Sequence, residues 1–185
     1  MDKHLKEVFY KWIPFAITTT LLCGLMYFLL QQNYRMSAND PQIQLSEDVK
    51  NSILAGQNPA AFIPGRKLDL STTLATFIIL YDKNKKLIGS SVSLDNKEPI
   101  IPTGVLDASK KNGETKITWQ PKNGVREALV VNYYKGSQEG YVAIGRSLRE
   151  VEKREDKLFL ETLAGWFVIM SSTFGLFYLF NKRTS

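Results

Sequence analysis

Two long apolar blocks without charge lie near the two ends of this 185-residue chain, at residues 12–30 and 163–180. Each block approaches the roughly 20 residues that a helix needs to cross about 30 Å of hydrocarbon. Aromatic residues such as Trp12 and Trp166 flank the blocks, as they do at membrane interfaces. The alternative is a pair of helices buried in a soluble core. We predict two transmembrane helices, of which the first covers residues 12–31.

The start of the chain also has features of a secretory signal, because three lysines precede the first block. The block is too long for a typical signal peptide, and no A-x-A cleavage site follows it closely. We therefore expect an uncleaved anchor in a two-pass protein of the cell membrane. The expected cytoplasmic tails are residues 1–11 and 181–185, and the middle of the chain is expected outside. The positive-inside rule gives only mild help, because basic residues are divided about evenly between the two sides.

Between the blocks, residues 40–150 have the alternating pattern of a folded domain. Asp40-Pro41 is a typical helix start, and an apolar stripe with helical spacing follows it up to Gly56. A helix lying on the membrane surface is the alternative. Its polar face would then be basic, whereas Glu47 and Asp48 are acidic, so packing against a sheet is favoured.

Runs rich in β-branched and aromatic residues predict a hairpin followed by three more strands. The runs are residues 76–82, 87–93, 114–120, 125–134 and 141–146. A short helix, residues 103–112, separates the hairpin from the last three strands and ends at Gly113. Asn123-Gly124 marks a tight turn between two of these strands. Paired strands in this order favour an antiparallel α+β domain over a doubly wound fold.

The segment from residue 141 to residue 180 contains no proline. Ser147 and Glu150 fit the S-x-x-E capping box of a helix start. We therefore predict one exit helix over residues 147–180, roughly 50 Å long, that continues from the last strand into the second span. Ser147 and Glu150 are the residues predicted to couple the domain to this membrane helix.

Each span also contains two small residues four positions apart, a spacing that lets helices approach closely. These pairs are Thr20 with Gly24 and Ser171 with Gly175. They predict packing in the membrane, either in a homodimer or against a partner helix. The same pattern is also common by chance in membrane sequences.

Composition argues against several classes of function. The net charge of +6 comes from scattered lysines, which is not a nucleic-acid signature. The only cysteine, Cys23, lies in the first block, so no intramolecular disulfide can form. The only histidine, His4, lies on the N-terminal tail, far from any candidate nucleophile or zinc ligand. We expect no enzyme activity, no cofactor and no metal site.

Three segments carry a resemblance to a known family: FIILYDKNKKLIGSS, PTGVLDASKKNGETKITWQPKNGVREALVVNYY and YVAIGRSLREVEKRED. Over residues 40–160 the chain resembles the extracytoplasmic PAS-like (single Cache) sensor domain of bacterial membrane-bound histidine kinases and chemoreceptors. The resemblance implies an antiparallel sheet that holds a small ligand against its covering elements. Kinases of this kind continue after the second span, whereas this sequence ends at NKRTS. We therefore expect no kinase region, and a signal that passes sideways to another membrane protein.

By analogy with such domains, large or cationic residues on the central strands are the candidate ligand-binding residues: Trp119, Arg126, Tyr133 and Arg146. Each also has an ordinary structural explanation, as a half-buried sheet residue or a solvated arginine. The leading hypothesis is a membrane sensor that binds a small ligand or a partner. The alternative is an accessory subunit of a membrane complex, in which the domain serves only for docking.

Overall fold

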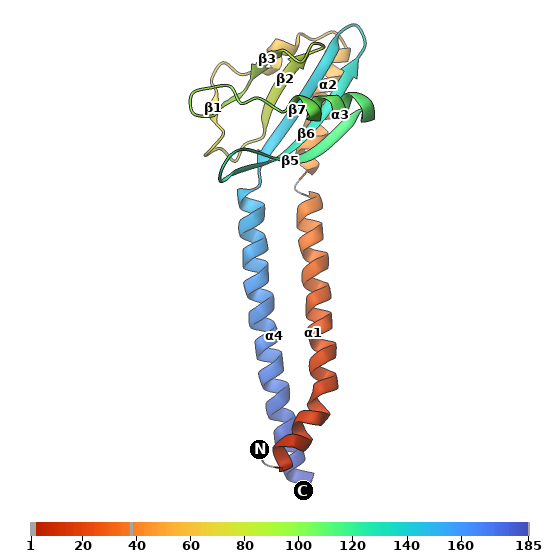
Figure 1. Cartoon of the computed structure of the whole chain (residues 1–185), viewed down its shortest axis with the longest axis vertical. Coiled ribbons are helices and arrows are strands. Elements are labelled where there is room, and N and C mark those ends of the chain that lie inside the picture. Colours follow the sequence, from red (N-terminus) through yellow and green to blue (C-terminus); the bar gives the residue numbers. More distant parts are fainter. Residues whose placement is uncertain (1–2, 38, 185) are drawn as a thin grey trace. The chain divides into compact units, whose positions relative to one another are not determined.

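The computed structural model describes residues 3–37 and 39–184 of the chain. It contains two compact units, one formed by Met1–Arg35 with Glu152–Ser185 and the other by Met36–Val151. We call them the helical unit and the sheet unit (Figure 1). Of the predicted tails, residues 1–2 and 185 lie outside the described residues, as does the side chain of His4.

The sheet unit is built on a five-stranded antiparallel sheet, which confirms the predicted α+β class. Its strands are β2 (Phe77–Asp82), β3 (Leu87–Ser90), β5 (Glu114–Lys122), β6 (Val125–Lys135) and β7 (Glu139–Ser147). Their order across the sheet is β3-β2-β7-β6-β5. The last strand in sequence is therefore the middle strand of the sheet, hydrogen-bonded to β2 on one side and to β6 on the other (Figure 1).

The second predicted strand is divided in two. β3 ends at Ser90, and after Ser91 a short strand β4 (Val92–Ser93) pairs in parallel with β1 (Leu68–Asp69). At the division the Ile78 amide donates a 2.8 Å hydrogen bond to the Ser91 side-chain Oγ, while the Ser91 amide donates to the Ile78 carbonyl. The β1 segment lies in a stretch with two prolines and two glycines that is typical of a loop, and its strand depends entirely on β4.

Side chains alternate between the two faces of the sheet, and each face is covered. Helix α2 (Asp40–Leu54) packs on one face, which we call the α2 face; helix α3 (Thr103–Asn112) packs on the other, the α3 face. The α2 face buries Val49, Ile53, Leu80, Tyr134, Val142 and Ile144. The buried α3 face includes Leu70, Phe77, Ile79, Tyr81, Leu106, Trp119, Leu129, Val131, Tyr141 and Ala143. A 3₁₀ helix, η1 (Pro59–Phe62), lies in the loop after α2.

A glycine lies under an aromatic ring at the centre of the α3 face. Gly145 on β7 is the cross-strand partner of Phe77 on β2. A Cβ added at Gly145 would lie 2.2 Å from Cζ of Phe77, far inside van der Waals contact. Phe77 is fully buried, so its ring occupies the space that any other residue at position 145 would need.

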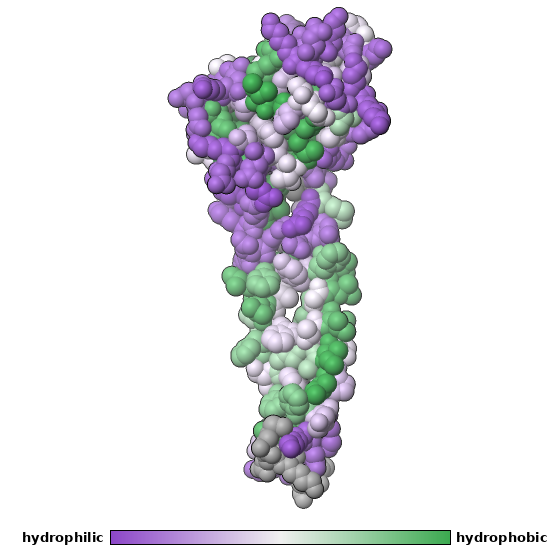
Figure 2. Space-filling model, in the orientation of Figure 1, coloured by the Kyte–Doolittle hydropathy of each residue, from purple (hydrophilic) through white to green (hydrophobic). Residues whose placement is uncertain are grey.

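The helical unit consists of most of α1 (Lys3–Ser37) and most of α4 (Arg149–Thr184). By length and composition, both helices are able to cross a membrane, and at most 6% of either apolar segment is buried inside the protein. Core helices of a soluble protein would be mostly buried. Figure 2 shows the apolar surface as a band along the two helices, with polar surface at the ends of the band.

α4 begins two residues after its predicted start. Ser147 is the last residue of β7, and only Leu148 separates that strand from the helix. The Ser147 Oγ accepts a hydrogen bond from the Arg149 amide at 3.4 Å, two residues along the chain rather than the three of a capping box. The last strand and the exit helix therefore follow each other almost directly.

Candidate functional site

The sheet separates the four residues predicted to bind a ligand. Trp119 and Tyr133 lie on the α3 face, where Trp119 packs against Phe77 with ring centroids 6.5 Å apart. Arg146 pairs with Ala128 on β6, and its exposed side chain lies on the α2 side of the sheet. Arg126 precedes Ala128 by two residues and so lies on that side as well. The two aromatic residues and the two arginines do not form a single site.

The α3 face instead has a polar cluster where α3 ends. We call it the α3 corner and define it by Lys110 on α3, Tyr133 on β6, and Glu139 and Tyr141 on β7. The Tyr133 hydroxyl donates a hydrogen bond to Glu139 Oε1 at 2.6 Å, and Lys110 Nζ donates to the same oxygen at 3.2 Å. Lys110 Nζ also lies 5.4 Å from the centroid of the Tyr133 ring. Only Tyr133 was among the predicted site residues.

The charges in the α3 corner follow from these contacts. Hydrogen bonds from Tyr133 and Lys110 lower the pKa of Glu139. The hydrogen bond to Glu139 in turn raises the pKa of Lys110 and of Tyr133. At neutral pH the corner therefore contains a carboxylate, an ammonium group and a neutral phenol.

The fourth residue of the corner, Tyr141, has an unsatisfied polar group. Its side chain is fully buried, and its ring centroid is 5.4 Å from that of Tyr133. Within the described part of the chain, its hydroxyl has no hydrogen-bond partner. Thr115 on β5, which lies on the same face, has a buried Oγ1 in the same state. Burying a hydroxyl without a partner costs about 1–3 kcal/mol, so the corner contains polar atoms that a bound molecule could satisfy.

A second buried polar group, the Glu127 carboxyl, lies near the junction of β7 and α4. Glu127 on β6 is only 1% exposed and lies between its cross-strand neighbours Trp119 and Ser147. Its Oε2 has no partner among the described residues. Burial raises the pKa of Glu127 to about 8, although the nearby Arg149 acts in the opposite direction. Arg149 itself donates a 2.6 Å hydrogen bond to the Ser71 carbonyl. The carboxyl group is therefore mostly protonated at neutral pH.

Two reciprocal tryptophan–threonine hydrogen bonds join the helices of the helical unit, beside the Lys11–Asn181 hydrogen bond and the Arg35–Glu155 ion pair. The indole Nε1 of Trp12 on α1 donates to Thr173 Oγ1 on α4 at 3.1 Å, and Nε1 of Trp166 on α4 donates to Thr20 Oγ1 on α1 at 2.9 Å. Each threonine hydroxyl donates in turn to a carbonyl one helical turn earlier. Thr20, predicted to pack in the membrane, therefore forms part of the contact within the chain.

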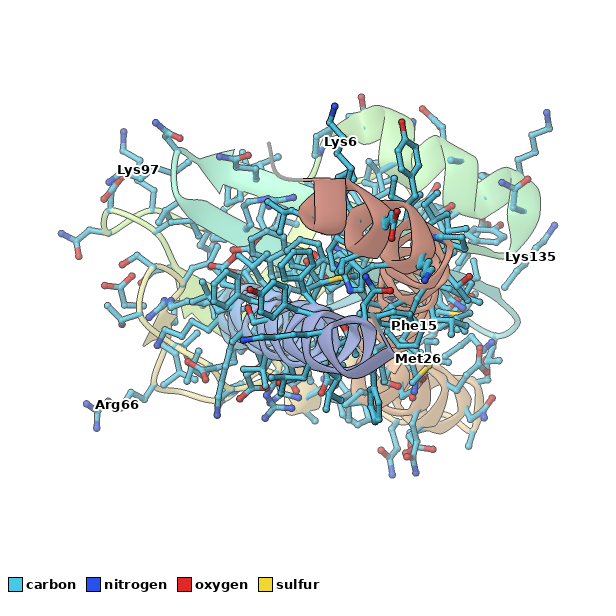
Figure 3. All side chains as sticks on the ribbon, turned by 90° about the horizontal axis from the view of Figure 1, so that it is seen from below. Lys6, Phe15, Met26, Arg66, Lys97 and Lys135 are labelled. Carbon is cyan, nitrogen blue, oxygen red and sulfur yellow. The ribbon has the colours of Figure 1, made fainter. Side chains whose placement is uncertain are left out.

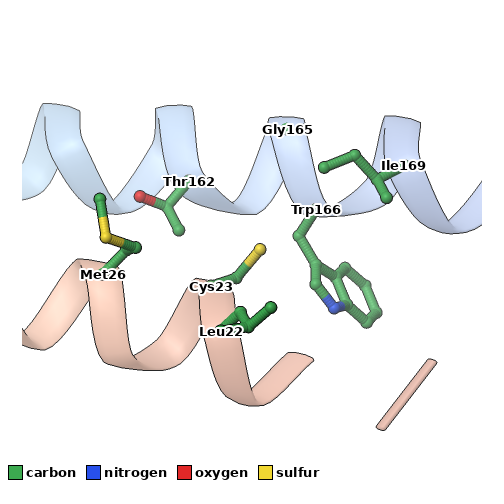
Figure 4. Close-up of a pocket in the computed structure, with 7 residues that line it drawn as sticks. All are labelled: Leu22, Cys23, Met26, Thr162, Gly165, Trp166 and Ile169. Carbon is green, nitrogen blue, oxygen red and sulfur yellow. The ribbon is translucent and has the colours of Figure 1, made fainter. Parts of the chain in front are cut away.

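The other three predicted packing residues lie away from this contact. Nothing lies within 4 Å of a Cβ added at Gly24 or Gly175, and Ser171 is exposed. A shallow apolar groove of about 270 Å³ runs between the two helices (Figure 4). Its lining residues are Leu22, Cys23, Met26, Thr162, Gly165, Trp166 and Ile169. Packing of the three small residues against another helix stays a prediction.

Comparisons with family models, with curated proteins and with solved structures found no match to this chain. Among the residues that the structure describes, no group of three or more His, Cys, Asp or Glu side chains could hold a metal ion.

Proposed function

We propose that the protein is a two-pass membrane sensor whose sheet unit is an extracytoplasmic PAS-like (single Cache-like) domain. In this proposal a small ligand binds at the α3 corner, and the signal passes to another membrane protein; no catalysis is involved. The order of elements supports the proposal: helix, hairpin, short helix and three antiparallel strands, preceded and followed by a helix long enough to span a membrane. This is the order that carries the resemblance to such sensor domains.

The observation that carries the proposal is the Tyr141 hydroxyl, which is fully buried, has no hydrogen-bond partner among the described residues and belongs to the same cluster as the Lys110–Glu139 ion pair. The Lys110–Glu139 pair and the unsatisfied Tyr141 hydroxyl together provide the few placed polar groups of a typical ligand site. Tyr141 is itself part of the apolar core of the α3 face, and Tyr133 packs against that core. A ligand that bonds to Tyr141 would recover the free energy lost by burying its hydroxyl.

A route from the α3 corner to the membrane follows from β7. Both Glu139 and Tyr141 lie on this strand, which occupies the middle of the sheet and leads through Leu148 into α4. Leu148 is itself held by a 2.9 Å hydrogen bond from its amide to the Arg126 carbonyl. A shift of β7 on ligand binding would therefore reach α4 with only one residue between them. The exposed Ser171 and the open positions Gly24 and Gly175 offer lipid-facing contacts for a partner helix.

Ligand binding is tested by a thermal-shift screen of the full chain in detergent micelles against small acids, amines and neutral polar compounds. We expect at least one compound to raise the melting temperature of the wild type by several degrees. Tyr141→Phe, which removes only the hydroxyl, should lose most of that rise. If no compound stabilises the protein and it co-purifies with a membrane protein, the accessory docking role replaces the sensor role.

Membrane orientation is tested with single cysteines in a Cys23→Ser background. Lys97 in the sheet unit and Lys6 on α1 both have exposed side chains that project outward (Figure 3). We expect a membrane-impermeant maleimide to label Lys97→Cys on intact cells and to label Lys6→Cys only after permeabilisation. The reverse pattern would place the sheet unit in the cytoplasm and overturn the extracytoplasmic assignment.

A further inference from the structure

We propose that the α3 corner is specific for a primary ammonium group, which takes the place that the Lys110 ammonium occupies in this structure. This inference rests on the proposed ligand-binding function and adds the chemical class of the ligand. In this view the Lys110 ammonium occupies the ligand's position when no ligand is present. A free amine displaces the Lys110 side chain when it binds.

Three features of the corner favour a cation. The lowered pKa of Glu139 keeps its carboxylate ionised at neutral pH. The Tyr133 ring lies 5.4 Å from the Lys110 ammonium, within the distance at which an aromatic face attracts a cation. α3 ends at Asn112, and the carbonyl end of a helix carries partial negative charge. The group already held there, the lysine ammonium, has the chemistry that these features select.

Displacing Lys110 costs little. Its side chain is 50% exposed, and exposed ion pairs contribute weakly because water screens them. The corresponding equilibrium favours the bound lysine over the released one by only a factor of about 1.5 to 5. A free alkylammonium can reproduce the contact with Glu139. It also has further N–H donors, one of which can bond to the Tyr141 hydroxyl, which has no partner in the described structure.

An anionic ligand is the competing possibility, because Lys110 could bind a carboxylate. Glu139 argues against it, since its carboxylate already lies 3.2 Å from the lysine Nζ and would repel a second anion. The two possibilities assign opposite roles to Lys110. An ammonium ligand competes with this side chain, whereas an anion requires it.

The experiment measures the affinity of the full chain in detergent micelles for three probes of one size: n-propylammonium, propionate and n-propanol. We expect n-propylammonium to bind best. Lys110→Met should tighten its binding about two- to six-fold, because the tethered competitor is gone. Glu139→Gln should weaken it more than tenfold, and Tyr141→Phe about two- to tenfold for one lost hydrogen bond.

Lys135→Met is the matched control. It removes the same charge from the cross-strand neighbour of Glu139, but Lys135 projects into solvent (Figure 3). Its effect at physiological salt should stay below twofold. Near-ultraviolet circular dichroism checks that each variant is folded.

Two results would overturn the ammonium assignment and leave the sensor proposal standing: preferential binding of propionate that Lys110→Met abolishes, or equal binding of all three probes. If none of the three probes binds, the ammonium assignment is also overturned, and the wider screen then decides whether any ligand binds. Tighter binding of n-propylammonium to Lys110→Met, with Lys135→Met unchanged, supports the inference.

Discussion

Raising the pH from about 5 to about 9 is expected to destabilise the sheet unit by several kcal/mol, and Glu127→Gln should remove most of this loss. The pKa of Glu127 is about 8 in the folded protein against an ordinary value of 4.5. Between these two values the folded state binds more protons than the unfolded state. Stability therefore falls as pH rises, by up to about 1.4 kcal/mol per pH unit. Below 4.5 the group is protonated in both states, and above about 8 it is ionised in both, so the slope vanishes outside this window.

Trp119 provides the measurement, because it lies opposite Glu127 in the sheet. The chain has three tryptophans, so Trp12→Phe with Trp166→Phe leaves Trp119 as the single fluorescent reporter. Urea unfolding of the full chain in detergent is then followed at each pH. Glu139→Gln is a useful control, because the pKa of Glu139 is lowered and its contribution is lost towards acid rather than towards alkali. A wild-type stability that stays constant or rises between pH 5 and 8 would mean that Arg149 or a water molecule already stabilises the ionised Glu127.

Gly145→Ala is expected to cost about 3 kcal/mol or more of the free energy of unfolding. The new methyl group would lie 2.2–2.8 Å from three atoms of the Phe77 ring. Phe77 is fully buried, so the ring can move only by disturbing the rest of the α3 face. Overpacking of a core usually costs 1–3 kcal/mol and exceeds this range when the surroundings cannot relax.

The same Trp119 fluorescence assay tests this substitution. Gly65→Ala adds the same methyl group where no atom lies within 4 Å, and its effect should stay within about 0.5 kcal/mol. Phe77→Leu should partly rescue Gly145→Ala, because the smaller side chain leaves room for the methyl group. A stability unchanged by Gly145→Ala would show that β2 and β7 separate easily at this point.

The sequence pattern predicted the main elements well, because their signals are local. α3 occupies the predicted residues 103–112 and is capped by Gly113, whose φ of 83° suits glycine. β6 and β7 extend only one or two residues beyond their predicted ends. β1 was missed because its two residues are a strand only through pairing with β4. The division of β3 from β4 was missed because β4 pairs with β1 rather than with β2, and because the Ile78 amide bonds at this point to the Ser91 side chain, 13 residues further along the chain.

The candidate site was harder to predict than the fold. Tyr133 was singled out as a large residue on a central strand, but nothing local marks Lys110 or Glu139 as its partners. The corner forms because β6 and β7 pair with Tyr133 opposite Tyr141, and because α3 brings Lys110 to the same place. One feature of the sequence could have marked Glu127 as a buried polar residue. It is charged, but it occupies a position where the alternating pattern of its strand predicts an apolar residue.

In the proposed membrane arrangement, the two tryptophan–threonine pairs bear on the depth of α1 and α4 in the bilayer. A tryptophan at the membrane surface usually marks depth, because its indole N–H seeks water or lipid headgroups. Here both indoles already donate to threonines whose own hydrogens are bonded to helix carbonyls. The indoles therefore have no need of the interface, and in the proposed bilayer they would not fix the depth of α1 and α4. The depth of the α1–α4 pair would then be set by the charged residues at the helix ends, and the two indoles would not resist a change of depth.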